Sequence, residues 1–260
     1  DVDELLILQY QHYITTLRTE RGYPYSVGVK NLHLIVLKNL FRYLLRIGEI
    51  QKNPTLTIEL AKEPRRLPVN ILTEKEMRVI LEQPDVSSNR GLRDRAMMEV
   101  LYASGIRRSE LLGLNITEMC FETNTLTIRQ GKGSRDRVVP MGSVAKKYLL
   151  LYLDVRKSFV PEGINTQAVF VSYRGKRLDK QTLKTVISYY AMKANLRKNV
   201  TPHIFRHCCA THLLNNGANI AFIQQLLGHE RLQTTIRYLQ VSILDLKAVH
   251  AKCHPRELYL

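Results

Sequence analysis

Six side chains in this sequence are of types that act on phosphate diesters. They are Arg107, Lys132, His203, Arg206, His229 and Tyr238. Guanidinium groups match the charge that spreads over non-bridging phosphate oxygens in the transition state, because they donate bidentate hydrogen bonds. A phenol becomes a covalent nucleophile once a base removes its proton. No clustered Asp and Glu set suggests a magnesium site and no P-loop is present, so the residues predict phosphoryl transfer without a metal.

The stretch "TPHIFRH" (201–207) places two of these residues at the start of a predicted helix. Thr201 is a favourable N-cap and Pro202 suits the first helical position. His203 and Arg206 then lie one turn apart, at a helix end that favours phosphate. The alternative is that His203 caps the helix and Arg206 is an ordinary solvated residue.

The stretch "ASGIRRSELLGL" (103–114) contains a second candidate group. Gly105 has the position of a glycine that ends a helix, which would turn the chain just before Arg107. Because Arg107 and Arg108 are consecutive, they face different ways, which would allow one to point into a site and the other to contact a backbone phosphate. Glu110 is a plausible partner for an arginine here. The alternative is two arginines on a solvated face.

Lys132, His229 and Tyr238 have weaker individual signals. Lys132 lies within "GKG" at the tip of a predicted hairpin, where an ammonium can reach a leaving-group oxygen. His229 follows Gly228, which is expected to end a helix at 219–227. Tyr238 follows nine residues further on and lies on the next predicted helix. The alternatives are that Lys132 simply faces solvent and that Tyr238 packs in the core.

Charge and composition narrow the class of protein. The chain has 39 Lys and Arg against 23 Asp and Glu, a net charge of +16, which is typical of a protein that neutralises nucleic-acid phosphates. Most of the excess lies in 73–260, and 174–198 has eight basic residues with one acid. The sequence has no apolar run of about 18 residues, so it predicts no membrane-spanning helix. The four cysteines lack metal-ligand spacing, which argues against zinc and favours a reducing compartment.

The apolar pattern predicts two parts joined by a linker. Helical spacing over 3–20 and 26–47 indicates a helical N-terminal domain at 1–62. Prolines and arginines at 63–72 indicate an extended linker. "TEKE" (73–76) is a capping box that opens a second domain at 73–260.

Within 73–260 the pattern predicts a mainly α fold with a small antiparallel β-sheet. A helix over 90–104 and another from 108 precede an alternating stretch, 124–141, that turns through two glycines and is typical of a β-hairpin. Residues 168–172 are expected to form a third strand. Helices are predicted from 178 onward.

Taken in order and spacing, four motifs resemble the tyrosine recombinase family (phage integrase, Xer-like). They are "SGIRRSE", "QGKGSRDRVVP", "TPHIFRHCCATHLL" and "LGHERLQTTIRY". The resemblance spans about 72–252, and the first 65 residues look like the family's helical core-binding domain. That domain is usually longer, so we expect a truncated or compact variant. Cys208 and Cys209 stand where the family often has Ser and Phe, which should alter packing rather than chemistry.

The resemblance implies a role for each of the six residues. Tyr238 attacks a phosphodiester to give a 3′-phosphotyrosine and a free 5′-hydroxyl. Arg107, Arg206 and His229 stabilise the transition state. Lys132 is the general acid for the 5′-oxygen and His203 accepts the phenol proton. No cofactor or ATP is needed, because the covalent link keeps the bond energy.

The resemblance also implies partners. We expect the protein to bind double-stranded DNA with a specific recombination site and to assemble as a homotetramer or heterotetramer on two such sites. The apolar C-terminal helix predicted at 242–255 is either donated to a neighbouring subunit or packed on its own domain. An accessory DNA-bending protein is a further possible partner, and a cytoplasmic location in a bacterium, archaeon or phage-infected cell is expected. Predicted DNA contacts are Arg65, Arg66, Arg108, Arg135, Arg174, Lys176, Arg177 and Lys180.

Several readings of the function stay open at this point. Mobile-element integration or excision and Xer-type resolution share one chemistry. A type IB topoisomerase shares the site, although the compact N-terminal domain and the "LGH" motif favour a recombinase. A non-catalytic DNA-binding protein, with helices 219–227 and 234–241 imitating a helix-turn-helix, would have no use for all six residues.

Overall fold

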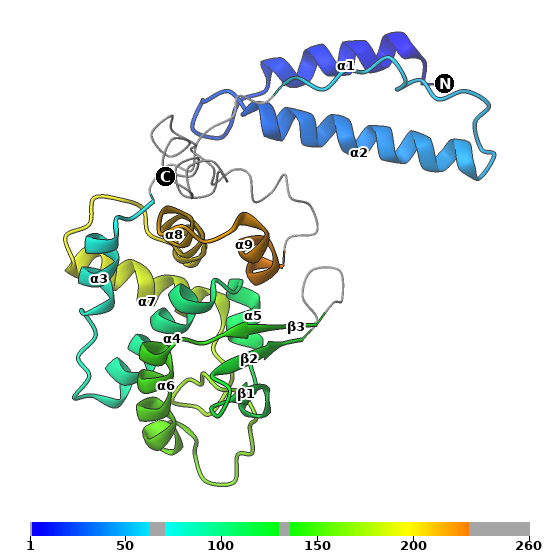
Figure 1. The fold of residues 1–260 in the computed structure, drawn as a ribbon. Coiled ribbons are helices and arrows are strands. Elements are labelled where there is room, and N and C mark those ends of the chain that lie inside the picture. Colours follow the sequence, from blue (N-terminus) through cyan, green and yellow to red (C-terminus); the bar gives the residue numbers. More distant parts are fainter. Residues whose placement is uncertain (1, 63–70, 130–135, 229–260) are drawn as a thin grey trace, which may run out of the picture. The chain divides into compact units, whose positions relative to one another are not determined.

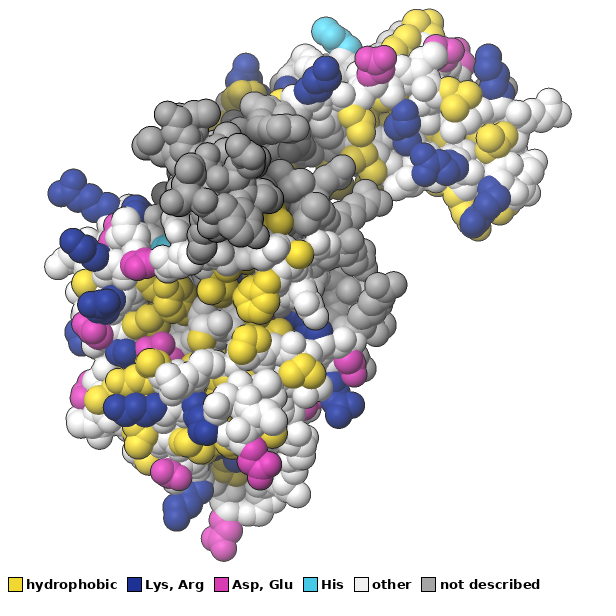
Figure 2. Space-filling model, in the orientation of Figure 1, with side chains coloured by type: hydrophobic (Ala, Val, Ile, Leu, Met, Phe, Trp, Pro, Cys, Tyr) yellow, Lys and Arg dark blue, Asp and Glu magenta, His cyan; other side chains and the backbone are white. Residues whose placement is uncertain are grey.

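The computed structural model describes residues 2–62, 71–129 and 136–228, which belong to two separate units, Asp1–Arg66 and Leu67–Leu260 (Figure 1). The described elements are mainly helical, with one small antiparallel sheet, as predicted. Most of the predicted linker lies outside the described residues. Lys and Arg side chains are spread over the visible surface of both units, with Asp and Glu between them (Figure 2).

The first unit is built on two helices. These are α1 (Glu4–Thr16) and α2 (Val27–Arg46). Asp3 and Ser26 cap them by accepting backbone hydrogen bonds from Leu6 and Val29. A small core holds them together and consists of Ile7, Ile14, Leu34, Phe41 and Ile58.

The first helix ends earlier than the sequence pattern suggests. We expected it to continue to residue 20, but Leu17 is already extended. A bridge between Arg18 and Pro24, with a hydrogen bond from the Thr19 nitrogen to the Tyr23 carbonyl, turns the chain back instead. The backbone groups of this stretch therefore find partners across the turn rather than along a helix.

The second unit contains the remaining elements. Its helices are α3 (Glu74–Leu81), α4 (Asn89–Ser104), α5 (Arg108–Gly113), α6 (Ser143–Arg156), α7 (Lys180–Lys193), α8 (Pro202–Asn215) and α9 (Ile220–Leu227), with 3-10 turns η1 (Ile116–Glu118) and η2 (Lys157–Phe159). The predicted capping box of Thr73 and Glu76 opens α3. The central helix is α4, which is buried along most of its length and packs chiefly against α6 and α8.

The sheet consists of a predicted hairpin and one short strand. Strands β2 (Thr125–Ile128) and β3 (Arg137–Pro140) pair antiparallel with Leu126 opposite Val139, which confirms the hairpin. The third strand is β1 (Met119–Cys120). The prediction of a third strand at 168–172 was wrong. That segment makes only isolated bridges, and Ala168 to Val171 are all buried in succession, so it fills the core instead of extending the sheet.

Helix α8 is fixed near its C-terminal end by a buried histidine. The Nε2 of His212 lies 2.8 Å from the Leu72 carbonyl oxygen, which can only accept. Nε2 therefore carries the proton, and Nδ1 accepts from the Tyr102 hydroxyl at 2.8 Å. The thiol of Cys208 accepts from the Leu72 nitrogen at 3.3 Å. The start of the second unit is thus tied to the helix that carries His203 and Arg206.

Gly105 ends α4 as the sequence predicts, and a residue with a side chain would be strained in its backbone conformation. Its φ is +60°, in the left-handed region. A Cβ there would lie 2.9 Å from Leu227 Cδ2 and 3.2 Å from Cys209 Sγ. The turn allows α9 to pack closely against the chain just before Arg107.

We predict that Gly105→Ala lowers the free energy of unfolding by about 1–3 kcal/mol, because the alanine would be strained and would clash with Leu227. Urea denaturation measures this change. Gly113→Ala is the matched control, since open space surrounds Gly113. Equal stability of the two variants would contradict this account of the turn.

Candidate active site

Three guanidinium groups converge on the C-terminal end of α9. They belong to Arg137, Arg206 and Arg107, which donate to the carbonyls of Leu226, Leu227 and Gly228 at 3.3, 2.6 and 3.1 Å respectively. The last carbonyls of a helix have no partner within the helix and carry partial negative charge. This end of α9 is therefore a natural acceptor for cations, and it holds three of them side by side.

The turn at Gly228 completes this arrangement. Gly228 is left-handed, with a φ of +62°, and ends α9 as expected, while Asn219 caps the other end. A Cβ on Gly228 would lie 3.1 Å from the Arg137 side chain. A larger residue would therefore displace either Arg137 or the turn that leads to His229.

Glu110 joins two of the three arginines. Its carboxylate is 5% exposed and accepts from Arg107 Nη1 at 2.8 Å and from the Arg107 backbone nitrogen at 2.7 Å. Arg137 donates to the same carboxylate in a bidentate pair, at 2.9 and 2.7 Å. The expectation that Glu110 partners an arginine is confirmed, and it partners two.

These bonds determine the ionisation of Glu110. Burial alone would raise the pKa of this carboxyl group, but the hydrogen bonds and charges of Arg137 and Arg107 outweigh burial and lower its pKa to about 2. Glu110 is therefore a carboxylate at neutral pH and cannot serve as a general acid. Its role is to hold guanidinium groups in place.

Arg206 is anchored more deeply than a surface residue. Its side chain is 2% exposed and donates to the Gly105 carbonyl at 2.7 Å as well as to Leu227. The alternative of a solvated Arg206 is wrong. Thr201 is the N-cap residue of α8 and Pro202 follows it, as predicted, although the Thr201 side chain makes no capping hydrogen bond.

His203 is exposed at the start of α8 and lies near Arg206 and Arg107. The surrounding protein partly desolvates its ring, and this, together with the charges of Arg206 and Arg107, lowers its pKa below the usual value. Its ring packs edge-on against His207, with 4.4 Å between centroids. At neutral pH the imidazole is therefore unprotonated, so that a ring nitrogen is available to accept a proton.

The structure thus places Arg107, His203 and Arg206 in one region. Lys132, His229 and Tyr238 lie outside the described residues, as do Arg65, Arg66 and Arg135. For Lys132, the hairpin strands on either side are in place. For His229, the preceding residue is held by Arg107.

The described candidates for DNA contact differ in what their side chains do. Arg108, Arg174, Lys176 and Lys180 are exposed. Arg177 donates to the Leu112 and Leu114 carbonyls at 2.7 and 3.1 Å and to Asn115 at 2.6 Å. Its guanidinium therefore fastens the end of α5, and contact with DNA stays a prediction for it.

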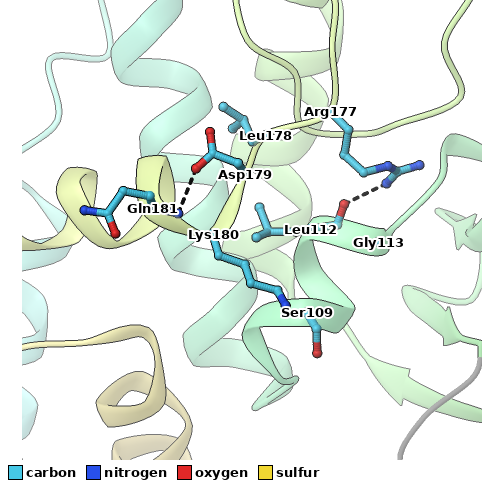
Figure 3. A pocket seen from close by; sticks show the side chains of 8 residues that line it. All are labelled: Ser109, Leu112, Gly113, Arg177, Leu178, Asp179, Lys180 and Gln181. Carbon is cyan, nitrogen blue, oxygen red and sulfur yellow. Dashed lines mark hydrogen bonds between the residues drawn. The ribbon is translucent and has the colours of Figure 1, made fainter.

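Lys180 and Arg177 border an open pocket of about 600 Å³ between α5 and the start of α7 (Figure 3). Leu112 and Leu178 give it an apolar lining. Asp179 caps α7 by accepting from the backbone of Gln181 and Thr182, so its carboxylate already occupies the helix end. This arrangement makes the α7 end a poor site for an isolated anion.

Sequence reasoning missed Arg137. Its signal was the alternation of "RVVP", because side chains two positions apart on a strand share a face. Val139 is buried, and Arg137 lies on the same face with its side chain only 13% exposed. A charged residue on the inner face of a strand requires a buried partner, here Glu110.

Three further observations concern the described part of the chain. No group of three or more His, Cys, Asp or Glu side chains that could hold a metal ion occurs among the described residues. None of the described helices is long and apolar enough to cross a membrane. Cys120, Cys208 and Cys209 are free thiols.

Comparison with known proteins identifies the family of this chain. Residues 70–243 match the phage integrase family. The chain is 36% identical over 259 residues to tyrosine recombinase XerC 2 of Ralstonia nicotianae, covering 99% of this chain and 74% of the relative. It is 38% identical over 239 residues to tyrosine recombinase XerD of Pseudomonas aeruginosa, covering 92% and 79%.

Solved structures show the same fold. XerA recombinase aligns with a TM-score of 0.61 at 29% identity, covering 98% of this chain and 84% of that one. XerH recombinase bound to palindromic difH aligns with a TM-score of 0.76 at 23% identity, covering 96% and 72%. The chain belongs to the phage integrase family. It is a site-specific tyrosine recombinase, an enzyme that cleaves and rejoins DNA.

The low pKa of Glu110 gives a pH-dependent stability. Because the folded pKa is lowered to about 2, the stabilisation is fully present above the unfolded value and is lost as the pH falls towards 2. We predict that Glu110→Gln costs about 3 kcal/mol at pH 7 and clearly less at pH ~3.5. Urea denaturation of both proteins at the two pH values measures this. A cost independent of pH would show that the carboxylate is not stabilised by these arginines.

Proposed function

We propose that Tyr238 is the nucleophile of this recombinase and that Arg107, Arg206 and His229 stabilise the phosphate it attacks. The observation that carries the proposal is the convergence of Arg107 and Arg206 on neighbouring carbonyls at the end of α9. The residue after that end is His229, and Tyr238 follows nine positions later. Guanidinium groups fixed in this way need no reorganisation when charge develops on the phosphate.

Two further residues move protons in this proposal. His203, whose pKa is lowered by its surroundings, is neutral at pH 7 and accepts the phenol proton of Tyr238. Lys132, on the hairpin between β2 and β3, gives a proton to the departing 5′-oxygen. The phenol oxygen forms a bond to phosphorus as the bond to the 5′-oxygen breaks. The resulting 3′-phosphotyrosine keeps the bond energy, so a 5′-hydroxyl can reverse the step without ATP.

The partner is double-stranded DNA with a specific site. Supporting this are relatives such as XerH bound to difH and a lambda integrase dimer bound to a COC′ core site. Arg108, Arg174, Lys176 and Lys180 are exposed cations that we assign to the DNA backbone. Arg65, Arg66, Arg135 and Arg177 complete the proposed set.

Assembly and cellular setting follow from the reaction. Exchange between two duplexes requires the cleavage of four strands, and each active site provides one tyrosine. We therefore propose a tetramer on two DNA sites, made of one or two kinds of recombinase. A cytoplasmic setting is supported by the bacterial relatives, since bacterial DNA lies there. Integration or excision of a mobile element and Xer-type resolution both remain within this proposal.

We predict that the wild-type protein forms a covalent adduct with DNA in EDTA and that Tyr238→Phe forms none. The DNA is a pool of nicked duplexes with a randomised central segment, so that the unknown site can be selected. Denaturing gels detect the adduct, and sequencing of the recovered DNA reads the site. Salt-sensitive binding without any adduct would contradict the proposal, and an adduct in Tyr238→Phe would show that another residue is the nucleophile.

Arg107→Ala is the second variant in that experiment. It should lose adduct formation by about 10²–10³-fold, as expected for the loss of one donor to a developing oxyanion, and bind DNA nearly as well as wild type. A parallel fall in binding and cleavage would remove Arg107 from the transition state.

We predict that Lys176→Gln and Lys180→Gln each weaken DNA binding and reduce the slope of log affinity against log salt by about 1, because each loses one phosphate contact. Fluorescence anisotropy at several salt concentrations measures the slope. Lys75→Gln, an exposed lysine of α3 outside the proposed set, is the control and should keep the wild-type slope. Identical slopes in all three variants would remove these lysines from the interface.

A further inference from the structure

Arg137 connects three elements of the active-site region. It is the first residue of β3, five positions after Lys132. Its Nη1 and Nη2 donate to the two oxygens of Glu110 on α5, and its Nε donates to the Leu226 carbonyl at the end of α9. All three nitrogens of its guanidinium are therefore engaged. Its guanidinium is thereby tied to both α5 and α9, which suits a role in positioning other residues.

Arg107 differs from Arg137 in both exposure and bonding. Its side chain is 25% exposed, against 13% for Arg137. Its Nη1 donates to Glu110 and its Nη2 to Gly228, while within the described part of the chain its Nε has no hydrogen-bond partner. Arg107 thus keeps an Nε donor that no described residue uses, on a side chain that is partly exposed to solvent.

The charge on Glu110 affects how strongly Arg107 attracts a phosphate. A carboxylate paired with a single guanidinium forms a neutral pair, which attracts an anion weakly. With Arg137 bound to the same carboxylate, the group of three carries one net positive charge. The pairs are largely buried, where screening by water is weak, so this difference is felt strongly by a nearby phosphate.

We propose that Arg137 is a positioning residue for DNA cleavage, which neutralises Glu110 so that Arg107 stays both fixed and available to the scissile phosphate. The same side chain holds the α9 end that precedes His229 and begins the strand that follows Lys132. This inference rests on the proposed function, since it assigns Arg107 to the phosphate. It adds a residue outside the six that the sequence identified.

The test is a double-mutant cycle on the rate of adduct formation in a single turnover, with the DNA selected from the nicked pool as probe. Arg137→Gln should slow adduct formation by about 10²-fold, comparable to loss of an oxyanion donor, with DNA affinity changed little. Adding Glu110→Gln should then recover about tenfold, because no carboxylate is left to neutralise Arg107. Arg137→Lys keeps the charge without the bidentate geometry and should lie between wild type and Arg137→Gln.

A purely structural role for Arg137 predicts a different pattern. Removing Glu110 as well would then disturb the same network further, so the double variant would be as slow as Arg137→Gln or slower. That result, or a wild-type rate in Arg137→Gln, would overturn the inference. Thermal melting of every variant shows that the rates refer to folded protein.

A second measurement needs no DNA. In labelled protein, the NMR signal of the Glu110 carboxyl carbon reports the ionisation of this side chain. The carboxyl group should remain ionised down to pH ~4 in the wild type and should titrate at a higher pH in Arg137→Gln. An unchanged titration would overturn the inference even if cleavage is impaired. Failure of the wild type to form any adduct would instead contradict the proposed function, and the titration would still decide whether Arg137 neutralises Glu110.

Discussion

The active-site region depends on one buried carboxylate that is shared by two guanidinium groups. Glu110 fixes Arg107 through a side-chain bond and a backbone bond, and it fixes Arg137 through a bidentate pair. Because burying an unpaired carboxylate would cost free energy, the positions of Glu110 and of the two guanidinium groups are determined together. The end of α9 provides the other half of this constraint, because its unpaired carbonyls accept Arg137, Arg206 and Arg107 in succession. Positive charge is thus held in one place before any phosphate arrives.

The rest of the second unit supports that arrangement by bringing distant segments to it. Helix α4 lies in the core and ends in the left-handed turn at Gly105, whose carbonyl also accepts from Arg206. Helix α8 is tied to the start of the unit through His212 and the Leu72 carbonyl. Strand β3 brings Arg137 to the same region from the hairpin that includes Lys132. Preorganisation of this kind is what allows fixed cations to favour a transition state over a ground state.

Much of this could be predicted from sequence because its signals are local. Gly105, Gly228 and the Thr73 capping box each have a conformational or hydrogen-bonding reason that their neighbours reveal. The family motifs predicted six catalytic residues, of which the structure describes Arg107, His203 and Arg206. The strand expected at 168–172 failed because a run of buried residues fits a core segment as well as a strand. Arg137 was missed because its partners lie 27 and 89 positions away, and no local pattern identifies such partners.

The most direct test of the account is a crystal structure of Tyr238→Phe bound to the DNA that the wild type selects from the nicked pool. The account predicts that Arg107 and Arg206 bind non-bridging oxygens of the same phosphate, with residue 238 next to it. Arg137 should remain on Glu110 without touching the DNA. Arginines bound to separate phosphates, or Arg137 moved from Glu110 to the scissile phosphate, would contradict the account.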